Sequence, residues 1–266
     1  MIFKYKKSIK YQDFDKIYEQ CSGPGGLKLT EFIAEKMNIK RDRILLDVGA
    51  NRGYQTCFLA KEYGIFAVAI DPTDDRVDNK PVVEHIRENA TKWGVSNKVI
   101  AIKLGVPNTF FSSDTFDYVY SSTTLEMIRC QYGEKGYLDA LQEIYRILKP
   151  GGIFGLGEPM HLEKELPKDL IPYVSQREDP WKDCFSSISK TKEFVIKAGF
   201  EVVEADYAPD AKLWWAEYAK FDPFCIKDPK GDPMTLKVDN GRWVSFGYVI
   251  AKKRNNKART AHKRYA

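Results

Sequence analysis

The residues best suited to chemistry form a short loop of small side chains and an acid that follows it. Leu46-Asp-Val-Gly-Ala-Asn-Arg-Gly53 comes directly after an apolar run and directly before a helical pattern. Small residues at such a turn let backbone N–H groups approach a ligand, and the start of the next helix favours negative charge. Asp71 ends the following apolar run, 18 residues after Gly53. Because a carboxylate placed there can accept hydrogen bonds from both hydroxyls of a ribose, the two features predict a nucleoside pocket.

The elements that must position this pocket alternate between strands and helices. Short apolar runs, typical of strands buried on both faces of a sheet, lie at 43–48, 65–70, 98–103, 116–120 and 152–156. Helical patterns lie between them, at 54–63, 80–93 and 137–148. This alternation predicts an α/β fold in which helices cover both faces of a parallel sheet. Lys149-Pro-Gly-Gly152 ends the last of these helices, since proline cannot continue it.

The pattern changes character after Glu158. Residues 159–189 are rich in Pro, Lys, Glu and Asp, which indicates a lid or an insertion. A helix over 191–198 and a strand over 200–204 follow. A long irregular segment, 208–241, then precedes a last apolar run at 243–250. Because two strands joined without a crossover helix run antiparallel, we expect the last strand to be antiparallel to its neighbours.

Four segments together resemble a known family: Leu45–Gly53, Ala67–Asp71, Phe116–Ser121 and Ile147–Gly152. The chain resembles the class I S-adenosylmethionine (SAM)-dependent methyltransferases, in particular the small-molecule branch that includes the ubiquinone and menaquinone biosynthesis enzymes. The resemblance covers about residues 26–158 and implies SAM as the cofactor. It also implies a Rossmann-like, mostly parallel seven-stranded sheet with an antiparallel last strand, helices on both faces and lid insertions.

The resemblance also implies roles for individual residues, by position. The first loop shapes the site for the methionine part of SAM through Asp47, Gly49, Ala50, Asn51 and Gly53. Asp71 holds the ribose hydroxyls, Pro72 lines the adenine side, Gly105 and Val106 supply backbone contacts to the adenine edge, and Ser121 lies close to the sulfonium. Two positions depart from the family pattern. Asn51 replaces its middle glycine, a change that the tolerance of Asn for the left-handed conformation permits. Val106 replaces a frequent acid and so removes one acceptor for the adenine amino group.

Methyl transfer from a sulfonium depends more on positioning the acceptor than on acid–base chemistry. A proton must still leave a neutral O–H, N–H or S–H acceptor. Glu158 and His161, at the end of the fifth strand, are the candidates for this role. A surface histidine in a lid is the alternative for His161, and for Glu126 a solvated helix residue is the favoured interpretation. We expect no metal site.

The net charge of +5 on 266 residues first suggests a nucleic-acid partner. The last fifteen residues, however, hold seven Lys and Arg and no acid, so the rest of the chain carries a net charge of −2. A small-molecule methyl acceptor is therefore favoured, and nucleic acid is not expected. Two alternatives stay open: an RNA or protein methyltransferase that docks through the basic tail, and a non-catalytic homologue that binds SAM.

Cysteine usage and hydropathy predict a cytoplasmic protein. Five cysteines without a Cys-x-x-Cys pair indicate neither a secreted disulfide framework nor a zinc ribbon. No segment approaches the roughly 18 apolar residues of a membrane span. The predicted organisation is an N-terminal lid over 1–25, a methyltransferase domain over 26–251 with insertions at 159–189 and 208–241, and a basic tail over 252–266.

Overall fold

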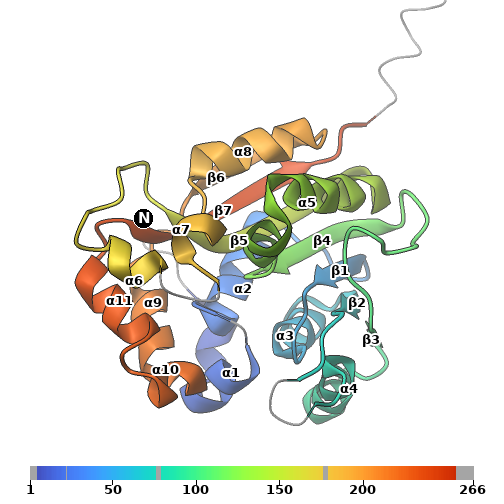
Figure 1. The fold of residues 1–266 in the computed structure, drawn as a ribbon. Helices are drawn as coiled ribbons and strands as arrows, with labels where there is room; N and C mark the ends of the chain where they lie inside the picture. Colours follow the sequence, from blue (N-terminus) through green and yellow to red (C-terminus); the bar gives the residue numbers. More distant parts are fainter. Residues whose placement is uncertain (1–4, 22, 76–78, 176–178, 256–266) are drawn as a thin grey trace, which may run out of the picture.

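A seven-stranded sheet runs through the middle of the molecule in the order β3-β2-β1-β4-β5-β7-β6 (Figure 1). The computed structural model describes residues 5–21, 23–75, 79–175 and 179–255. The strands are β1 (Ile44–Val48), β2 (Phe66–Ile70), β3 (Val99–Ile102), β4 (Phe116–Ser122), β5 (Leu148–His161), β6 (Glu201–Tyr207) and β7 (Val244–Lys252). β1 to β5 pair in parallel, whereas β7 is antiparallel to both β5 and β6. The predicted antiparallel last strand is confirmed.

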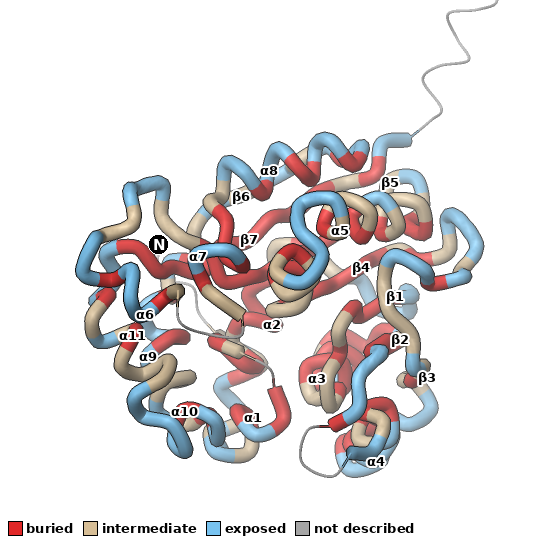
Figure 2. Tube along the Cα trace, in the orientation of Figure 1, coloured by how far each residue is buried: buried red, intermediate tan, exposed pale blue. Residues whose placement is uncertain are grey.

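Helices cover both faces of this sheet, as the strand–helix alternation predicts. The helices of the described residues are η1 (Ser8–Lys10), α1 (Phe14–Gln20), α2 (Gly26–Lys36), α3 (Tyr54–Tyr63), α4 (Val82–Trp93), α5 (Leu125–Ile147), α6 (Ile171–Ser175), α7 (Trp181–Cys184), α8 (Ile188–Lys197), α9 (Ala211–Phe221), α10 (Pro223–Lys227) and α11 (Asp232–Asp239). Successive residues of a strand point to opposite faces. Leu45 accordingly packs with residues of α2 and α3, and Leu46 with residues of α5 and α8. Figure 2 shows the buried sheet between these layers.

The segment 208–241 is not irregular, and that expectation was wrong. It contains α9, α10 and α11. Pro223 and Pro233 lie in the first turns of α10 and α11, where a helix needs no backbone N–H and proline is well tolerated. The prolines therefore mark the starts of short helices. The last two strands are antiparallel although helices connect them.

The N-terminal segment is anchored by a buried acid of α2. Glu31 accepts hydrogen bonds of 2.7–2.9 Å from the backbone N–H groups of Lys6, Lys7 and Ser8, and its Oε2 also accepts the Ser8 hydroxyl at 2.6 Å. Further along, the ring of Phe14 in α1 stacks on Phe221 in α9. The segment is thus packed between α2 and α9, and its role as a lid stays a prediction.

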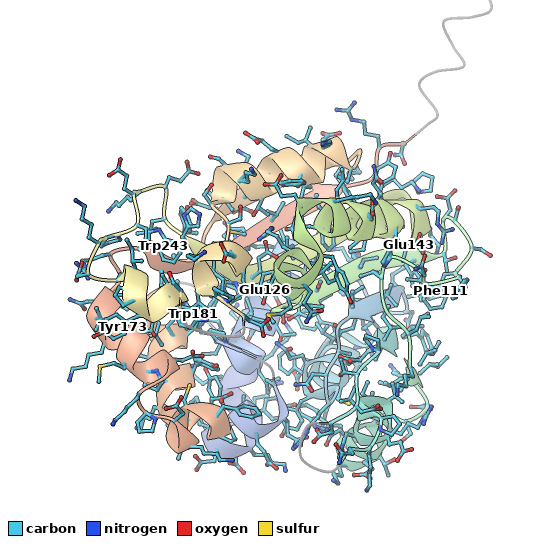
Figure 3. The ribbon with its side chains drawn as sticks, in the orientation of Figure 1. Phe111, Glu126, Glu143, Tyr173, Trp181 and Trp243 are labelled. Atoms are coloured by element: carbon cyan, nitrogen blue, oxygen red, sulfur yellow. A yellow bond between two sulfur atoms is a disulfide. The ribbon has the colours of Figure 1, made fainter. Side chains whose placement is uncertain are left out.

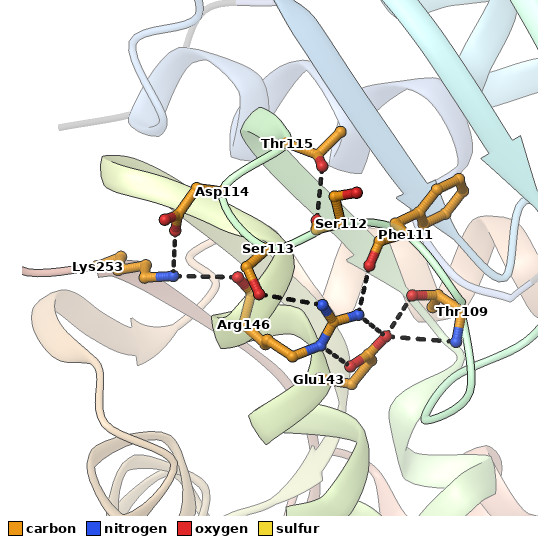
Figure 4. A network of polar contacts seen from close by, with 9 residues as sticks. All are labelled: Thr109, Phe111, Ser112, Ser113, Asp114, Thr115, Glu143, Arg146 and Lys253. Atoms are coloured by element: carbon orange, nitrogen blue, oxygen red, sulfur yellow. Dashed lines mark hydrogen bonds and ion pairs between the residues drawn. The ribbon is translucent and has the colours of Figure 1, made fainter.

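The C-terminal strand extends further than expected. β7 includes Lys252, and Lys253 is buried with its Nζ 2.7 Å from Asp114 Oδ1 and 3.1 Å from the Arg146 carbonyl oxygen. Figure 4 shows this network, which also joins the loop before β4 to α5. The start of the predicted tail at 252 is therefore wrong, because these two lysines belong to the folded body. Residues 256–266 of that tail lie outside the described residues.

One disulfide joins Cys130 of α5 to Cys184 of α7. The sequence separation of 54 residues gives no sign of it, because only the fold brings the two helices together. A single disulfide is not a disulfide framework, so the expectation from cysteine usage stays a prediction. Cys21, Cys57 and Cys225 are buried free thiols.

Candidate active site

The loop after β1 has the backbone conformation that its small residues allow. Gly49, Asn51 and Gly53 have φ angles of +74°, +46° and +72°. A Cβ on Gly49 would lie 2.2 Å from Thr124 Oγ1, so no other residue fits without displacing the start of α5. Asn51 adopts the left-handed conformation that Asn tolerates better than other non-glycine residues. The departure from the family pattern at this position is therefore compatible with the loop.

Asp71, at the end of β2, is bound directly to this loop. Its Oδ2 accepts the Asn51 backbone N–H at 2.9 Å, and its Oδ1 accepts the backbone N–H and hydroxyl of Thr73 at 2.9 and 2.6 Å. The residue is buried. The structure thus brings together the two features that predict a nucleoside pocket, the glycine loop and the acid.

The residues expected on the adenine side also lie together. The backbone N–H of Leu104 donates to the Asp71 carbonyl oxygen at 3.2 Å, which joins the ends of β2 and β3. A Cβ on Gly105 would lie 3.1 Å from Pro72 Cγ, so this glycine lies against the proline ring. Val106 follows directly and is half-buried. Three chain segments thus meet at one edge of the sheet.

Asp47 is a buried carboxylate beneath the loop. Thr56 Oγ1 donates to its Oδ2 at 2.6 Å. Burial, together with the negative charge of Asp71, raises the pKa of Asp47 to about 7. Ser121, opposite Val48 in the sheet, is fully buried and its hydroxyl donates to the Val48 carbonyl oxygen at 3.2 Å. The Ser121 hydroxyl thus donates its hydrogen bond within the sheet.

The N-terminal segment reaches the glycine loop through residues that sequence reasoning missed. Asn89 Nδ2 lies 2.9 Å from Gln20 Oε1 and 2.8 Å from the Arg52 carbonyl oxygen. Burial raises the pKa of the Cys21 thiol, and the nearby Asp47 charge adds to this shift. Asn89 of α4 thus joins the end of α1 to the loop. No local pattern at residues 20 and 21 indicates this contact, because it depends on the path of the whole N-terminal segment.

Glu158 lies in a buried charged cluster with α5. Its Oε1 accepts Arg129 Nη2 at 3.1 Å and the Tyr137 hydroxyl at 2.9 Å, and no part of the residue is exposed. Glu126 is 3% exposed, so the favoured interpretation of a solvated helix residue was wrong. Burial and the Glu158 charge raise the pKa of Glu126 well above its usual range. The first turns of α5 therefore face the interior.

His161 does not join this cluster. Its ring stacks on Trp243 with centroids 4.9 Å apart, and its Nδ1 donates to the Leu162 carbonyl oxygen at 2.8 Å. Residues three apart on a strand point to opposite faces, which separates its side chain from that of Glu158. The catalytic roles of Glu158 and His161 stay predictions. Because the two side chains point to opposite faces of the sheet, they do not contact each other.

A groove of about 540 Å³ lies between α1 and α10 and contains none of the predicted site residues. One residue of its lining, Glu19, has Oε1 3.8 Å from Arg52 Nη1 in the glycine loop. Within residues 5–255, outside the three short gaps, no three His, Cys, Asp or Glu side chains group as metal ligands would. Among the helices that the structure describes, none combines the length and apolar character of a membrane crossing.

The central part of the chain is similar to a known protein family. Residues 46–156 match the family model described as a methyltransferase domain. A sterol 24-C-methyltransferase from Pneumocystis carinii is 26% identical over 225 residues, which cover 82% of this chain and 56% of that protein. Phosphoethanolamine N-methyltransferase 1 from Arabidopsis thaliana is 26% identical over 172 residues, 64% of this chain and 32% of that protein. The chain spans about half the length, or less, of the curated relatives it matches.

Solved structures share the fold at low sequence identity. Phosphoethanolamine N-methyltransferase 2 from Haemonchus contortus, in complex with S-adenosyl-L-methionine, has a TM-score of 0.72 at 20% identity, covering 96% of this chain and 61% of that one. The [4+2]-cyclase SpnF has a TM-score of 0.66 at 20% identity, covering 86% and 81%. One fold thus serves different reactions. The chain has the Rossmann-like fold that these solved structures share, and its residues 46–156 are similar to the methyltransferase-domain family.

Proposed function

We propose that the protein is a SAM-dependent methyltransferase that acts on a small-molecule acceptor. The observation that carries this proposal is the hydrogen bond from the Asn51 N–H to Asp71, which fixes an acid beside the glycine loop. When bound, SAM supplies an electrophilic methyl group on a sulfonium. The residues present fit such a molecule, because a carboxylate, a loop with left-handed glycines and an open backbone edge meet at the ends of three strands.

Each part of the molecule would meet a different set of residues. Asp71 would accept the ribose hydroxyls, and Pro72 with Gly105 and Val106 would border the adenine. The methionine part would lie along the glycine loop, over Asp47, Gly49, Ala50, Asn51 and Gly53. The N-terminal segment would close this site, since Asn89 links Gln20 to the Arg52 carbonyl oxygen of the loop. Such a cover excludes water from the reacting groups.

The class of acceptor is supported by the relatives, whose names give sterol and phosphoethanolamine as substrates of those proteins. The nearly neutral body of the chain also favours a small molecule over a nucleic acid. Membership of the ubiquinone and menaquinone branch and a cytoplasmic location stay predictions. Incubation with isotope-labelled SAM and a metabolite extract, followed by separation of the labelled products, would identify the acceptor.

Titration calorimetry with SAM tests the proposal. We expect binding that Asp71→Ala weakens at least tenfold, because a charge-assisted hydrogen bond contributes about 1.5–3 kcal/mol. Asp74→Ala is the matched control. Asp74 is three residues away in the same loop, but its carboxylate is about half exposed and pairs with Lys103. Absence of SAM binding at high micromolar concentration would rule out the proposal, and equal affinity of Asp71→Ala would rule out the ribose assignment.

A further inference from the structure

The first turn of α5 lies against the proposed methyl-donor site. Thr124, the residue before this helix, has its Oγ1 3.4 Å from the Gly49 carbonyl oxygen. Glu126 follows two residues later, as the second residue of α5. Figure 3 shows Glu126 near the centre of the molecule, where α5 begins. Glu126 is thus two residues from a contact with the glycine loop, and it takes no part in the roles assigned above.

Three polar atoms of the cluster around Glu126 have no hydrogen-bond partner. They are Glu126 Oε2, Glu158 Oε2 and Arg129 Nε, and all are inaccessible to solvent. Other atoms of Glu158 and Arg129 do form hydrogen bonds. Glu158 Oε1 accepts Arg129 Nη2, and Arg129 Nη1 donates to the Cys184 carbonyl oxygen at 3.0 Å. Because buried polar groups in folded proteins almost always have partners, three such atoms in one cluster indicate a missing ligand.

The types of these atoms determine which ligand they suit. Two are carboxylate oxygens that accept hydrogen bonds, and one is a guanidinium N–H that donates. Two carboxyl groups share the one guanidinium of Arg129, so the cluster suits a cation better than an anion. A protonated amine brings a positive charge and several N–H donors. A hydroxyl group brings one donor and no charge.

We propose that Glu126, with Glu158 and Arg129 beside it, binds the amino group of the methyl acceptor and takes a proton from it. The inference rests on the proposed function and names its substrate class, an amine that carries an oxygen close to the nitrogen. The amino group meets Glu126 Oε2 and Glu158 Oε2, and the neighbouring oxygen meets Arg129 Nε.

Proton transfer follows from the need for a free electron pair. An ammonium nitrogen has none, so it cannot attack a methyl group. When one N–H bond breaks and an O–H bond forms at Glu126 Oε2, the nitrogen keeps the electron pair and the carboxyl becomes neutral. The raised pKa of Glu126 suits this exchange. The groups that face the carboxyls are Arg129 and Tyr137 of α5, Glu158 of β5, Thr191 of α8 and the Cys184 carbonyl of α7.

Binding of three small probes to the full chain saturated with S-adenosylhomocysteine tests the charge preference. Ethanolamine is the cation, ethylene glycol the neutral molecule and glycolate the anion, and all three have similar size. We expect calorimetry at pH 6 to show ethanolamine binding at least tenfold tighter than either of the others. Equal or tighter binding of glycol or glycolate overturns the inference.

Proton release identifies the group that responds. Burial and the Glu158 charge make Glu126 hold a proton more readily than an ordinary Glu, by raising its pKa, whereas an ammonium at Oε2 favours the ionised form. The binding enthalpy of ethanolamine should therefore depend on the ionisation enthalpy of the buffer, with up to one proton released. This measurement needs no variant. A binding enthalpy that is the same in two buffers with different ionisation enthalpies overturns the inference.

Glu126→Gln then assigns the effect. The carboxamide has the shape of the protonated carboxyl, so the variant should fold with an unchanged melting temperature. It should bind ethanolamine at least tenfold more weakly and release no proton. Glu134→Gln is the matched control on the same helix, at an exposed position. If the wild-type protein binds SAM but not ethanolamine, this inference alone is overturned. If the wild-type protein does not bind SAM, the proposed function is overturned as well.

Discussion

The two edges of the proposed active site are built differently. At the edge formed by β1, β2 and β3, backbone N–H groups donate hydrogen bonds to both carboxylate oxygens of Asp71. At the edge formed by β4 and β5, side chains of α5 and β5 form a buried cluster with three unmatched atoms. The carboxylate of the first edge already has partners within the chain. The second edge keeps three polar atoms without partners, and the ligand we propose for them would be specific to this chain.

Arg129→Ala should have the largest effect on stability. It leaves Glu158 buried without its ionic partner and removes the guanidinium that lies 3.7 Å from the centre of the Tyr137 ring. Loss of one member of a buried pair typically costs about 3–5 kcal/mol. We expect the free energy of unfolding in urea at pH 7 to fall by about that amount.

A pair at the surface provides the control for this measurement. Lys190 of α8 and Glu134 of α5 form an ion pair as well, but both side chains are about half exposed. Lys190→Ala should change the free energy of unfolding by less than about 0.5 kcal/mol, as expected for exposed pairs. A similarly small effect of Arg129→Ala would show that the buried cluster does not depend on its ion pair.

Asp47→Asn should stabilise the protein in a pH-dependent way. In the folded state the pKa of Asp47 is about 7, and in the unfolded chain it is ordinary, about 3.9. The folded state therefore binds more protons between these values, so ionisation of this group costs stability as the pH rises from about 4 to 7. Asn removes that cost and can still accept the Thr56 hydroxyl.

The expected gain is about 2 kcal/mol in the free energy of unfolding at pH 8, and it should be smaller at pH 5. Urea unfolding of both proteins at the two pH values measures it. A gain that is equal at both would mean that Asp47 is ionised in the folded protein throughout. The same substitution should weaken SAM binding, since stabilising changes at functional sites commonly reduce function.

The sequence predicts the first edge well because its signals are local. A strand, a turn of small residues and a helix start follow one another between residues 44 and 54. The parallel register then places the ends of β1 and β2 side by side, so Asp71 must lie near that turn. Nothing beyond the order of elements is needed for this step.

The second edge could not be predicted in this way, because its residues meet only through the fold. β5 continues to His161 since it pairs with β7, a strand more than eighty residues later in the sequence. α7 adds the Cys184 carbonyl from a segment that reads as a lid. For Glu126, a polar residue in a helix is usually solvated, and no pattern near it shows that the first turn of α5 faces inward.

Asn51→Gly should have the smallest effect, and it tests whether the first edge acts through its backbone. The residue already has a left-handed φ of +46°, and its backbone N–H makes the bond to Asp71. Glycine keeps both features. We expect the free energy of unfolding to change by less than about 0.5 kcal/mol, because Gly and Asn both tolerate this conformation. SAM affinity should change less than threefold.

Asn51→Val places a β-branched residue in the same conformation and should lower the free energy of unfolding by about 1–2 kcal/mol. If instead the glycine variant lost SAM binding, the Asn51 side chain would contribute directly, and the two edges would differ less than their hydrogen bonds indicate.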